Sequence, residues 1–379
     1  MVIWDMNFRH LAAIAKIGEL GTMNAAAQAV NLTQPAITQA LGRIERMLGV
    51  PLFERRHDGM AQTAAAELFV PRVRAALDHI SSPHVTMSRF RALLALAETG
   101  SYSGASHDTG LSLPSLHRAV NDLALSLRRP LVERRGKIVV LTDLGAGVAR
   151  AFRLARVELE AGLGELEALK GHETRRIVIG AMPLSRARVL PAAITRFQRR
   201  YPDVRISIIE GSRSELVEPL RNGVIDLMVG ALRAPLLEPD IVQQALFSDL
   251  PAVVARKGHP LDGKRPGLRA LADYPWIVAS AGAPLRDSWE MMFTQAGLSL
   301  PPVPIESGSV MTIRQLLIDS DCLTLLSPDQ VAVELEADWL VTLCSAPAGL
   351  ERVIGISTRN SWRPTQVQSA FVEDLLAIA

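Results

Sequence analysis

The hexapeptide Pro51-Leu52-Phe53-Glu54-Arg55-Arg56 reappears 79 residues later as Pro130-Leu131-Val132-Glu133-Arg134-Arg135. At the same offset, and without a gap, two more pairs of segments match: Gln34-Pro35 with Leu113-Pro114, and Glu19-Leu20-Gly21-Thr22 with Glu98-Thr99-Gly100-Ser101. A register kept over such a length is not expected by chance, so the chain contains an internal repeat.

Each copy is expected to form three helices and a two-stranded ribbon. In the first copy, apolar residues recur at helical spacing over residues 8–17, which predicts an amphipathic helix. Thr22 and Thr33 are predicted N-caps of a short second helix and of a third helix that carries a proline in its first turn. Residues 52–55 predict a short strand, and residues 57–59 predict the turn at the tip of a wing. This is the order of a winged helix-turn-helix, and the second copy has the same plan.

The third helix of the first copy carries side chains that can read base edges in a major groove. They stand on its first turns, and they are Thr33, Gln34, Ala36, Thr38 and Gln39. Glutamine forms bidentate hydrogen bonds with adenine, threonine offers a hydroxyl and a methyl group, and alanine contacts the thymine methyl. Arg43, Arg46, Arg55 and Arg56 are suited to phosphates beside the groove. The alternative for this helix alone is an ordinary helical hairpin with a polar surface, but the wing and the repeat favour DNA binding.

Residues 6–62 resemble the N-terminal domain of LysR-type transcriptional regulators. The resemblance rests on Gly21-Thr22-Met23-Asn24-Ala25-Ala26, Leu32-Thr33-Gln34-Pro35-Ala36-Ile37-Thr38, Arg43-Ile44-Glu45 and Leu48-Gly49-Val50-Pro51-Leu52-Phe53-Glu54-Arg55. It implies that Thr33, Gln34, Pro35, Thr38 and Gln39 belong to the DNA-reading helix, and that Arg55 and Arg56 belong to the wing that grips the DNA backbone.

The second copy resembles the same domain through Ala97-Glu98-Thr99-Gly100-Ser101-Tyr102 and Leu141-Thr142-Asp143-Leu144-Gly145, but its reading helix departs from the pattern. Leu113 replaces the glutamine, Asp122 replaces Arg43, and His107-Asp108 are expected to interrupt the second helix. Three roles stay open for this copy: weak DNA binding, reading of another sequence, or dimerisation and spacing alone. Its candidate DNA-binding residues are Ser112, Ser115, His117, Arg118, Arg134 and Arg135.

Two further helices, rich in alanine, leucine and arginine, are expected over residues 63–80 and 143–170. LysR-type proteins dimerise through a long helix at this place and often form tetramers, so the resemblance implies a homo-oligomer, either a dimer or a tetramer. Because this chain has two such helices, pairing of the two within one subunit is the alternative.

From residue 175 onward, strands and helices alternate, which predicts a parallel sheet with ligand sites at the carboxyl ends of its strands. Three segments resemble the effector domain of LysR-type regulators, which folds into two lobes like periplasmic solute-binding proteins: Phe197-Gln198-Arg199-Arg200-Tyr201-Pro202-Asp203-Val204, Asn222-Gly223-Val224-Ile225-Asp226-Leu227 and Gly258-His259-Pro260-Leu261. The resemblance implies a small-molecule site between the lobes.

Loop and helix-start positions supply the candidate effector ligands, which are Ser185, Arg186, Ser212, Arg213, Ser280, Gly282, Met311 and Thr312. Helix N-termini favour anions, and together with Arg186, Arg188 and Arg213 they favour an acidic effector such as a carboxylate. The alternative for each serine or threonine is plain helix capping.

The expected fold is therefore multidomain: two all-α-rich winged helix-turn-helix domains, residues 6–82 and 83–171, each with its linker helix, followed by a two-lobed α/β periplasmic-binding-protein-like effector domain, residues 172–379. Lobe I is expected over residues 172–245 and 346–379, and lobe II over residues 246–345. Residues 1–170 hold 20 Lys and Arg against 16 Asp and Glu, while the rest of the chain holds 21 against 23, which leans towards DNA binding by the N-terminal part.

Other classes of protein are disfavoured. The eight histidines are scattered, no spacing suggests a metal site, and no Gly-rich phosphate loop follows a strand, so no enzyme activity, metal or cofactor is expected. Cys322 and Cys344 are expected to be core thiols, with a redox pair as the alternative. The N-terminus does not read as a signal peptide, no apolar run is long enough to span a membrane, and a cytoplasmic protein is expected.

The expected partners are double-stranded DNA, a small-molecule effector, further copies of the chain and RNA polymerase, with no membrane contact. The rival hypothesis is a solute-binding protein whose N-terminal repeats serve only oligomerisation.

Overall fold

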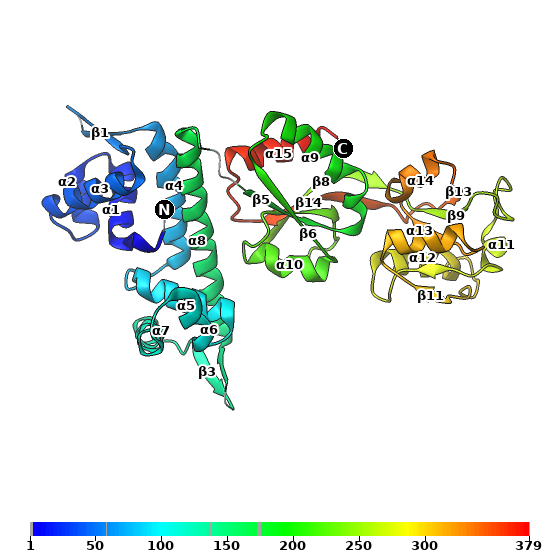
Figure 1. The fold of residues 1–379 in the computed structure, drawn as a ribbon, viewed down its shortest axis with the longest axis horizontal. Helices are drawn as coiled ribbons and strands as arrows, with labels where there is room; N and C mark the ends of the chain where they lie inside the picture. The colour runs from blue at the N-terminus through cyan, green and yellow to red at the C-terminus, as the bar shows by residue number, and fades with distance from the viewer. Residues whose placement is uncertain (1–2, 58, 137, 173–175, 379) are drawn as a thin grey trace. The chain divides into compact units, whose positions relative to one another are not determined.

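The computed structural model describes residues 3–57, 59–136, 138–172 and 176–378. The chain divides into two compact units, residues 1–175 and residues 176–379 (Figure 1). Among the described residues, no helix combines the length and the apolar character that crossing a bilayer requires.

The first unit contains both copies of the repeat. A short 3₁₀ helix (Ile3–Asp5) precedes the first copy, which consists of α1 (Phe8–Leu20), α2 (Met23–Ala29), α3 (Gln34–Leu48), the antiparallel hairpin of β1 (Phe53–Arg56) and β2 (Gly59–Gln62), and α4 (Ala64–Ile80). The second copy consists of α5 (Met87–Thr99), α6 (Tyr102–Thr109), α7 (Leu113–Leu127), the hairpin of β3 (Val132–Arg135) and β4 (Ile138–Leu141), and α8 (Asp143–Leu169). Every element of the second copy begins 79 residues after its counterpart, so the predicted repeat is confirmed.

Local capping explains why these helices begin where they do. The hydroxyl oxygens of Thr22, Thr33 and Ser112 each accept a hydrogen bond from the backbone N–H three residues later, at the starts of α2, α3 and α7. The expected interruption at His107-Asp108 is wrong. The helix α6 runs through both residues, whose side chains are exposed and therefore do not disturb the packed face.

The linker helices α4 and α8 pack against each other within the unit, which is the alternative that the sequence left open beside pairing between subunits. A single core extends through both copies, and a row of aromatic rings, Phe8, Phe90 and Phe152, joins the first helix of each copy to α8. The two copies therefore share one folded body.

The second unit has two lobes. The sheet of lobe I has the order β6-β5-β7-β14-β8, formed by β5 (Arg176–Ala181), β6 (Arg205–Glu210), β7 (Leu227–Ala231), β8 (Ile241–Asp249) and β14 (Arg352–Arg359). The strands β6, β5 and β7 are parallel as predicted, whereas β14 runs antiparallel to both of its neighbours. The helices α9 (Val189–Arg200) and α15 (Gln366–Leu376) pack on one face of this sheet, and α10 (Arg213–Arg221) packs on the other.

Lobe II contains β9 (Ala252–Arg256), α11 (Leu268–Ala272), β10 (Ile277–Val278), α12 (Pro284–Thr294), β11 (Ile305–Glu306), α13 (Val310–Ile318), β12 (Thr324–Leu326), α14 (Ala332–Glu336) and β13 (Leu340–Ser345). Its core is built on Trp276, Trp289 and Phe293, whose rings meet at 5.6–5.8 Å between centroids. Cys322 is buried and Cys344 is half-buried, and both are free thiols. The strand β8 pairs with β14 as far as Asp249, so lobe I reaches beyond the expected end at residue 245.

Candidate DNA-binding surface and effector cleft

The first turns of α3 present a row of polar side chains to solvent. Thr33, Gln34, Pro35, Thr38 and Gln39 are exposed and Ala36 is half-buried, while Ile37, Ala40 and Leu41 on the opposite face are buried in the core. The hydroxyl of Thr38 donates to the carbonyl oxygen of Gln34 at 3.1 Å, which fixes its rotamer. The helix therefore offers amide, hydroxyl and methyl groups on one rigid face, the chemistry that reads base edges.

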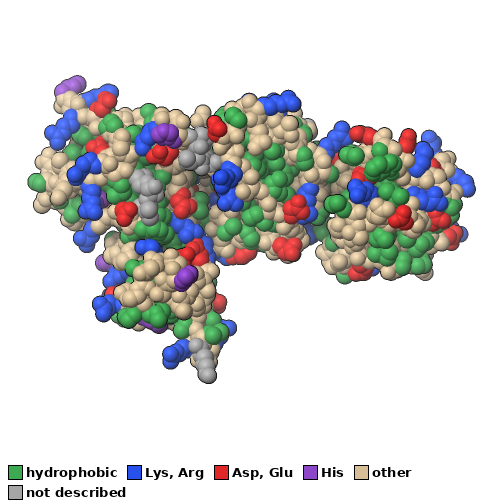
Figure 2. All heavy atoms as spheres, in the orientation of Figure 1, with side chains coloured by type: hydrophobic (Ala, Val, Ile, Leu, Met, Phe, Trp, Pro, Cys, Tyr) green, Lys and Arg blue, Asp and Glu red, His purple; other side chains and the backbone are tan. Residues whose placement is uncertain are grey.

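The wing of the first copy is attached to the end of α3. A carboxylate oxygen of Glu45 accepts from the backbone N–H of Leu52 at 2.7 Å and of Phe53 at 3.3 Å, so β1 begins at a fixed point beside the helix. On β1, Arg55 and Arg56 are exposed, as is Arg43 on α3. Figure 2 shows Lys and Arg side chains on both wings.

The second copy presents a different set of groups at the same places. The N-cap residue Ser112 is exposed, and so are Ser115, His117 and Arg118 on α7 and Arg134 and Arg135 on β3. The ring of His117 stacks on Tyr102 of α6 at 3.7 Å between centroids, and Arg135 pairs with Glu133 at 2.7 Å. These contacts hold His117 against its own domain, whereas Arg118 stands at an exposed position on the reading helix.

Asp122 is the residue of α7 that argues against phosphate contact. Its carboxylate is half-buried, and the guanidinium of Arg89 lies 3.9 Å from it. The nearby positive charge offsets part of the repulsion that a lone carboxylate would exert on a phosphate.

A cavity of about 870 Å³ lies between the two lobes of the second unit. Its apolar lining includes Met182, Leu184 and Val217 from lobe I and Leu285, Ile313 and Leu325 from lobe II. Its charged lining consists of Arg213, Arg233, Glu238 and Arg352. The volume falls within the range of ordinary small-molecule sites, and the lining suits a ligand with an apolar body and a polar end.

Arg213 is a charged group of this cavity that has one buried donor without a partner in the described part of the chain. Its Nη2 donates to a carboxylate oxygen of Glu238 at 2.7 Å, while its Nη1 is buried and has no hydrogen-bond partner among the described residues. A buried donor without a partner costs free energy. Arg352, in contrast, already donates to Asp249.

The structure separates the predicted effector ligands into two groups. Ser212, Arg213, Ser280 and Gly282 line the cavity, whereas Ser185, Arg186, Met311 and Thr312 are not among its lining residues. Ser185 is buried in a 3₁₀ turn (Pro183–Arg186) and donates to the carbonyl of Met182.

Arg186 and Thr312 outside the cavity, and Ser212 in its lining, have local structural partners of their own. Arg186 pairs with Glu210 at 2.9 Å, and Thr312 is capped through its backbone by Ser309. Ser212 caps α10 and donates to Glu215, which holds the pKa of that carboxyl below its ordinary value, first through the backbone N–H and then through the hydroxyl of Ser212.

Several lining residues were not singled out from the sequence, among them Arg233, Glu238, Thr324, Gln330 and Arg352. They come from loops and strands that are far apart in the sequence, and no local pattern marks them.

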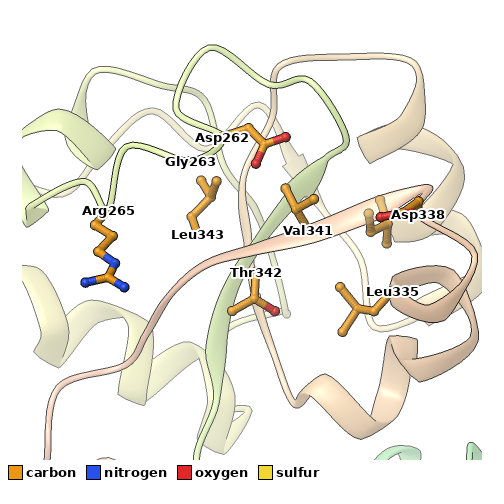
Figure 3. Close-up of a pocket in the computed structure, with 9 residues that line it drawn as sticks. Asp262, Gly263, Arg265, Leu335, Asp338, Val341, Thr342 and Leu343 are labelled. Atoms are coloured by element: carbon orange, nitrogen blue, oxygen red, sulfur yellow. The ribbon is translucent and has the colours of Figure 1, made fainter.

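A second pocket lies on lobe II, along β13 and away from the cleft (Figure 3). It is lined by Asp262, Gly263, Arg265, Asp338 and the apolar residues Leu335, Leu340, Val341 and Leu343, together with Thr342. Its two aspartates outnumber its one arginine, and Arg265 and Asp338 lie at opposite sides of it (Figure 3). This pocket does not suit an anion as the cleft does.

Comparison with known proteins decides the family. The model of the bacterial regulatory helix-turn-helix protein, lysR family, matches twice, at residues 8–67 and 87–146, and the model of the LysR substrate binding domain matches residues 170–378. The chain belongs to the LysR family. It is a DNA-binding transcription regulator with an effector-binding domain, and not an enzyme.

The HTH-type transcriptional regulator GalR of Pseudomonas putida is 32% identical to this LysR-family chain over 367 residues, which cover 93% of this chain and 92% of that protein. Among solved structures, a full-length OxyR variant from Pseudomonas aeruginosa has a TM-score of 0.54 and 22% identity, and full-length CbnR complexed with its target DNA has a TM-score of 0.53 and 18% identity.

The solved relatives are shorter than this LysR-family chain. OxyR and CbnR cover 78% and 77% of it, although it covers 97% and 99% of them. About a fifth of the chain is left without a counterpart, which is the share that one repeat of 79 residues occupies in 379.

Proposed function

We propose that α3 reads a specific base sequence in the major groove and that Arg43, Arg55 and Arg56 hold the flanking phosphates. We further propose that an effector in the cleft of residues 172–379 controls this DNA binding. The observation that carries the proposal is the exposed row of Gln34, Thr38 and Gln39 on a helix capped by Thr33 and braced against its wing. A helix of this kind places its N-terminal side chains against base edges.

A mobility-shift titration with the DNA upstream of the protein's own gene tests this reading function. The wild-type chain should bind specifically at moderate salt, and Gln34→Ala should weaken binding, while Leu20→Ala, an exposed substitution on α1, should leave it unchanged. Absence of specific DNA binding, together with tight binding of a solute, would favour the rival in which the repeats serve only oligomerisation.

The effector that the cleft suits best is a carboxylate with an apolar body. The guanidinium groups of Arg213 and Arg233 and the exposed hydroxyl of Ser280 belong to the polar lining, and aliphatic side chains cover much of the rest. An anion at this point would share the guanidinium of Arg213 with Glu238, whose carboxylate keeps that side chain in place.

Calorimetric titration with a panel of aromatic and aliphatic carboxylates and their uncharged amides tests this assignment. Carboxylates should bind at least about tenfold more tightly than the matching amides, since hydrogen bonds to a charged group contribute about 1.5–3 kcal/mol. Arg213→Met should abolish the preference, and Arg199→Met on the exposed side of α9 should retain it. Equal affinities for the acids and their amides would refute the assignment of a carboxylate effector.

The remaining parts of the proposal concern partners and place. We expect the effector domains to associate into dimers or tetramers, the DNA-bound protein to contact RNA polymerase, and the protein to act in the cytoplasm. Sedimentation with and without DNA tests the first of these expectations.

A further inference from the structure

The two linker helices run antiparallel within one chain. The ammonium of Lys170, directly after α8, donates to the carbonyl of Leu48 at the end of α3, so the C-terminal end of α8 lies at the first copy. The helix α8 begins at the second copy, where Thr142, its N-cap, donates to the carbonyl of Pro130. Each helix-turn-helix is thus joined to the N-terminal end of its own linker, and the two lie at opposite ends of the α4–α8 pair (Figure 1).

Each copy is braced to its linker by an ion pair at the end of its first helix, although the two arginines are not repeat counterparts. In the first copy, Arg74 of α4 pairs with Glu19 at the end of α1 at 2.9 Å. In the second copy, Arg156 of α8 pairs with Glu98, the repeat counterpart of Glu19, at 2.7 Å. The 27 residues of α8 correspond to a helix length of about 40 Å.

The interface between the linkers has a charge pattern that favours α4 with α8 over either helix with itself. Arg72 of α4 is buried and donates to Glu158 at 3.2 Å and Glu165 at 3.0 Å, both buried on α8. The repeat counterparts of these three residues are Ala151, His79 and Thr86, so neither helix carries both signs at these positions. Pairing α4 with a second α4 would bury two arginines without these carboxylates, which is costly.

The helices α4 and α8 also approach each other closely at Gly162. A Cβ atom on Gly162 of α8 would lie 3.0 Å from the ring of Phe69 and 3.1 Å from Cβ of Arg72 on α4. A Cβ atom there would require these side chains to shift by a few tenths of an ångström. The counterpart of Gly162 in the repeat is Pro83, beyond the end of α4. The contact surface of α8 is thus shaped for α4.

The two reading helices differ in the bases that they suit. Gln39 of α3 corresponds to Arg118 of α7, and both side chains are exposed. Glutamine pairs with the N6 and N7 positions of adenine, whereas arginine pairs with the O6 and N7 positions of guanine. Gln34 corresponds to Leu113, which is 45% exposed and offers an apolar contact in place of an amide.

We propose that one chain is a complete DNA-reading unit, in which α3 and α7 read two unlike half-sites of a single operator that is not palindromic. The proposal rests on the DNA-reading function proposed above. In a symmetric dimer, palindromic operators reflect two identical readers. Here the α4–α8 interface takes the place of the subunit interface, and the unlike readers at its two ends require unlike half-sites.

Selection from a random double-stranded DNA library with the full-length chain tests the proposal. Wild type, Gln39→Ala, Arg118→Ala and the control Leu125→Ala, an exposed residue on the last turn of α7, are selected in parallel. The wild type should enrich two different half-sites at a fixed spacing. Gln39→Ala should lower the preference for the specific base at one position of the first half-site, and Arg118→Ala should do the same in the other half-site. Each preference should fall by about 5- to 150-fold. The control should match the wild type.

Two results would overturn the proposal, and they are distinguishable. A palindromic motif, or a motif that responds to Gln39→Ala but not to Arg118→Ala, would leave the DNA-reading function of α3 intact and refute reading by α7. Enrichment of no sequence by the wild type would refute the proposed function as well.

Discussion

Arg72→Met removes the positive charge from the interface between α4 and α8 while keeping an apolar side chain of similar length. The side chains of Arg72, Glu158 and Glu165 are only 7–9% exposed. Burial alone would lower the pKa of Arg72, but hydrogen bonds and charge from Glu165 and then Glu158 outweigh it, so its pKa is raised above the ordinary value. The substitution leaves two carboxylates buried without the cation that they share.

Removal of one partner of a buried ion pair costs about 3–5 kcal/mol, because the remaining charge stays buried without the opposite charge that offset its desolvation. A loss of about 3 kcal/mol corresponds to a change of more than about 100-fold in the opening equilibrium. The triple variant Arg72→Met, Glu158→Met and Glu165→Met removes all three charges, and replacing a buried ionic cluster by apolar groups is often neutral or stabilising. We therefore expect the triple variant to recover most of the lost stability.

Hydrogen exchange measured on peptides from α4 and α8 reports this interface without interference from the second unit, since the exchange of each segment reflects its own opening. Exchange in both helices should accelerate by more than about 100-fold in Arg72→Met and return towards the wild-type rate in the triple variant. Unchanged exchange in Arg72→Met, or a triple variant as unstable as the single one, would refute the role given to the charge cluster.

Three further predictions concern other contacts. Glu45→Ala should destabilise the first wing by about 1.5–3 kcal/mol, because the backbone N–H groups of residues 52–53 lose a charged acceptor. Amide hydrogen exchange in the wing should therefore accelerate. Unchanged protection from exchange would refute the role of Glu45 in holding the wing. Gly162→Leu should push α4 away from α8 through a clash with Phe69, so the midpoint of denaturant unfolding of the first unit should shift to a lower denaturant concentration. An unchanged midpoint would contradict the close packing of the two helices. Burial lowers the pKa of His259 below its ordinary value, so the stability that the neutral imidazole contributes to lobe II is present above about pH 6.5 and is lost as the pH falls below that value. His259→Asn should therefore make the thermal stability of lobe II less dependent on pH. A variant with the same pH profile as the wild type would contradict this role of His259.

The repeat, the helix starts and the wings could be predicted from the sequence because their causes are local. Thr22 and Thr33 cap helices through hydrogen bonds to residues three positions away, and such spacing is visible in the chain itself. The interruption expected at His107-Asp108 was wrong for the opposite reason. Whether a polar residue disturbs a helix depends on which face is packed, and tertiary structure places both residues on the exposed face of α6.

The cleft shows the same division between local and long-range causes. Ser212 and Arg213 could be predicted because they stand at a helix start beside a strand end, and Ser280 and Gly282 because they follow a strand. Arg352 reaches the cavity because β14 returns to lobe I between β7 and β8, and Glu238 lies there paired with Arg213. The sequence also left open which helices pair, since the partners Arg72 and Glu165 are 93 residues apart.

The pairing of α4 with α8 inside a single chain is tested most directly by cross-linking in a mixture of isotopes. Equal amounts of ¹⁴N-labelled and ¹⁵N-labelled chains carrying photo-leucine are unfolded together, refolded and irradiated. The buried Leu159, Leu163 and Leu166 of α8 supply the reactive groups. Cross-links between α4 and α8 are then identified by mass spectrometry. We predict that every such cross-link joins peptides of the same isotope. Cross-links of mixed isotope in about half of the pairs, the share expected for random pairing between chains, would contradict the single-chain reading unit.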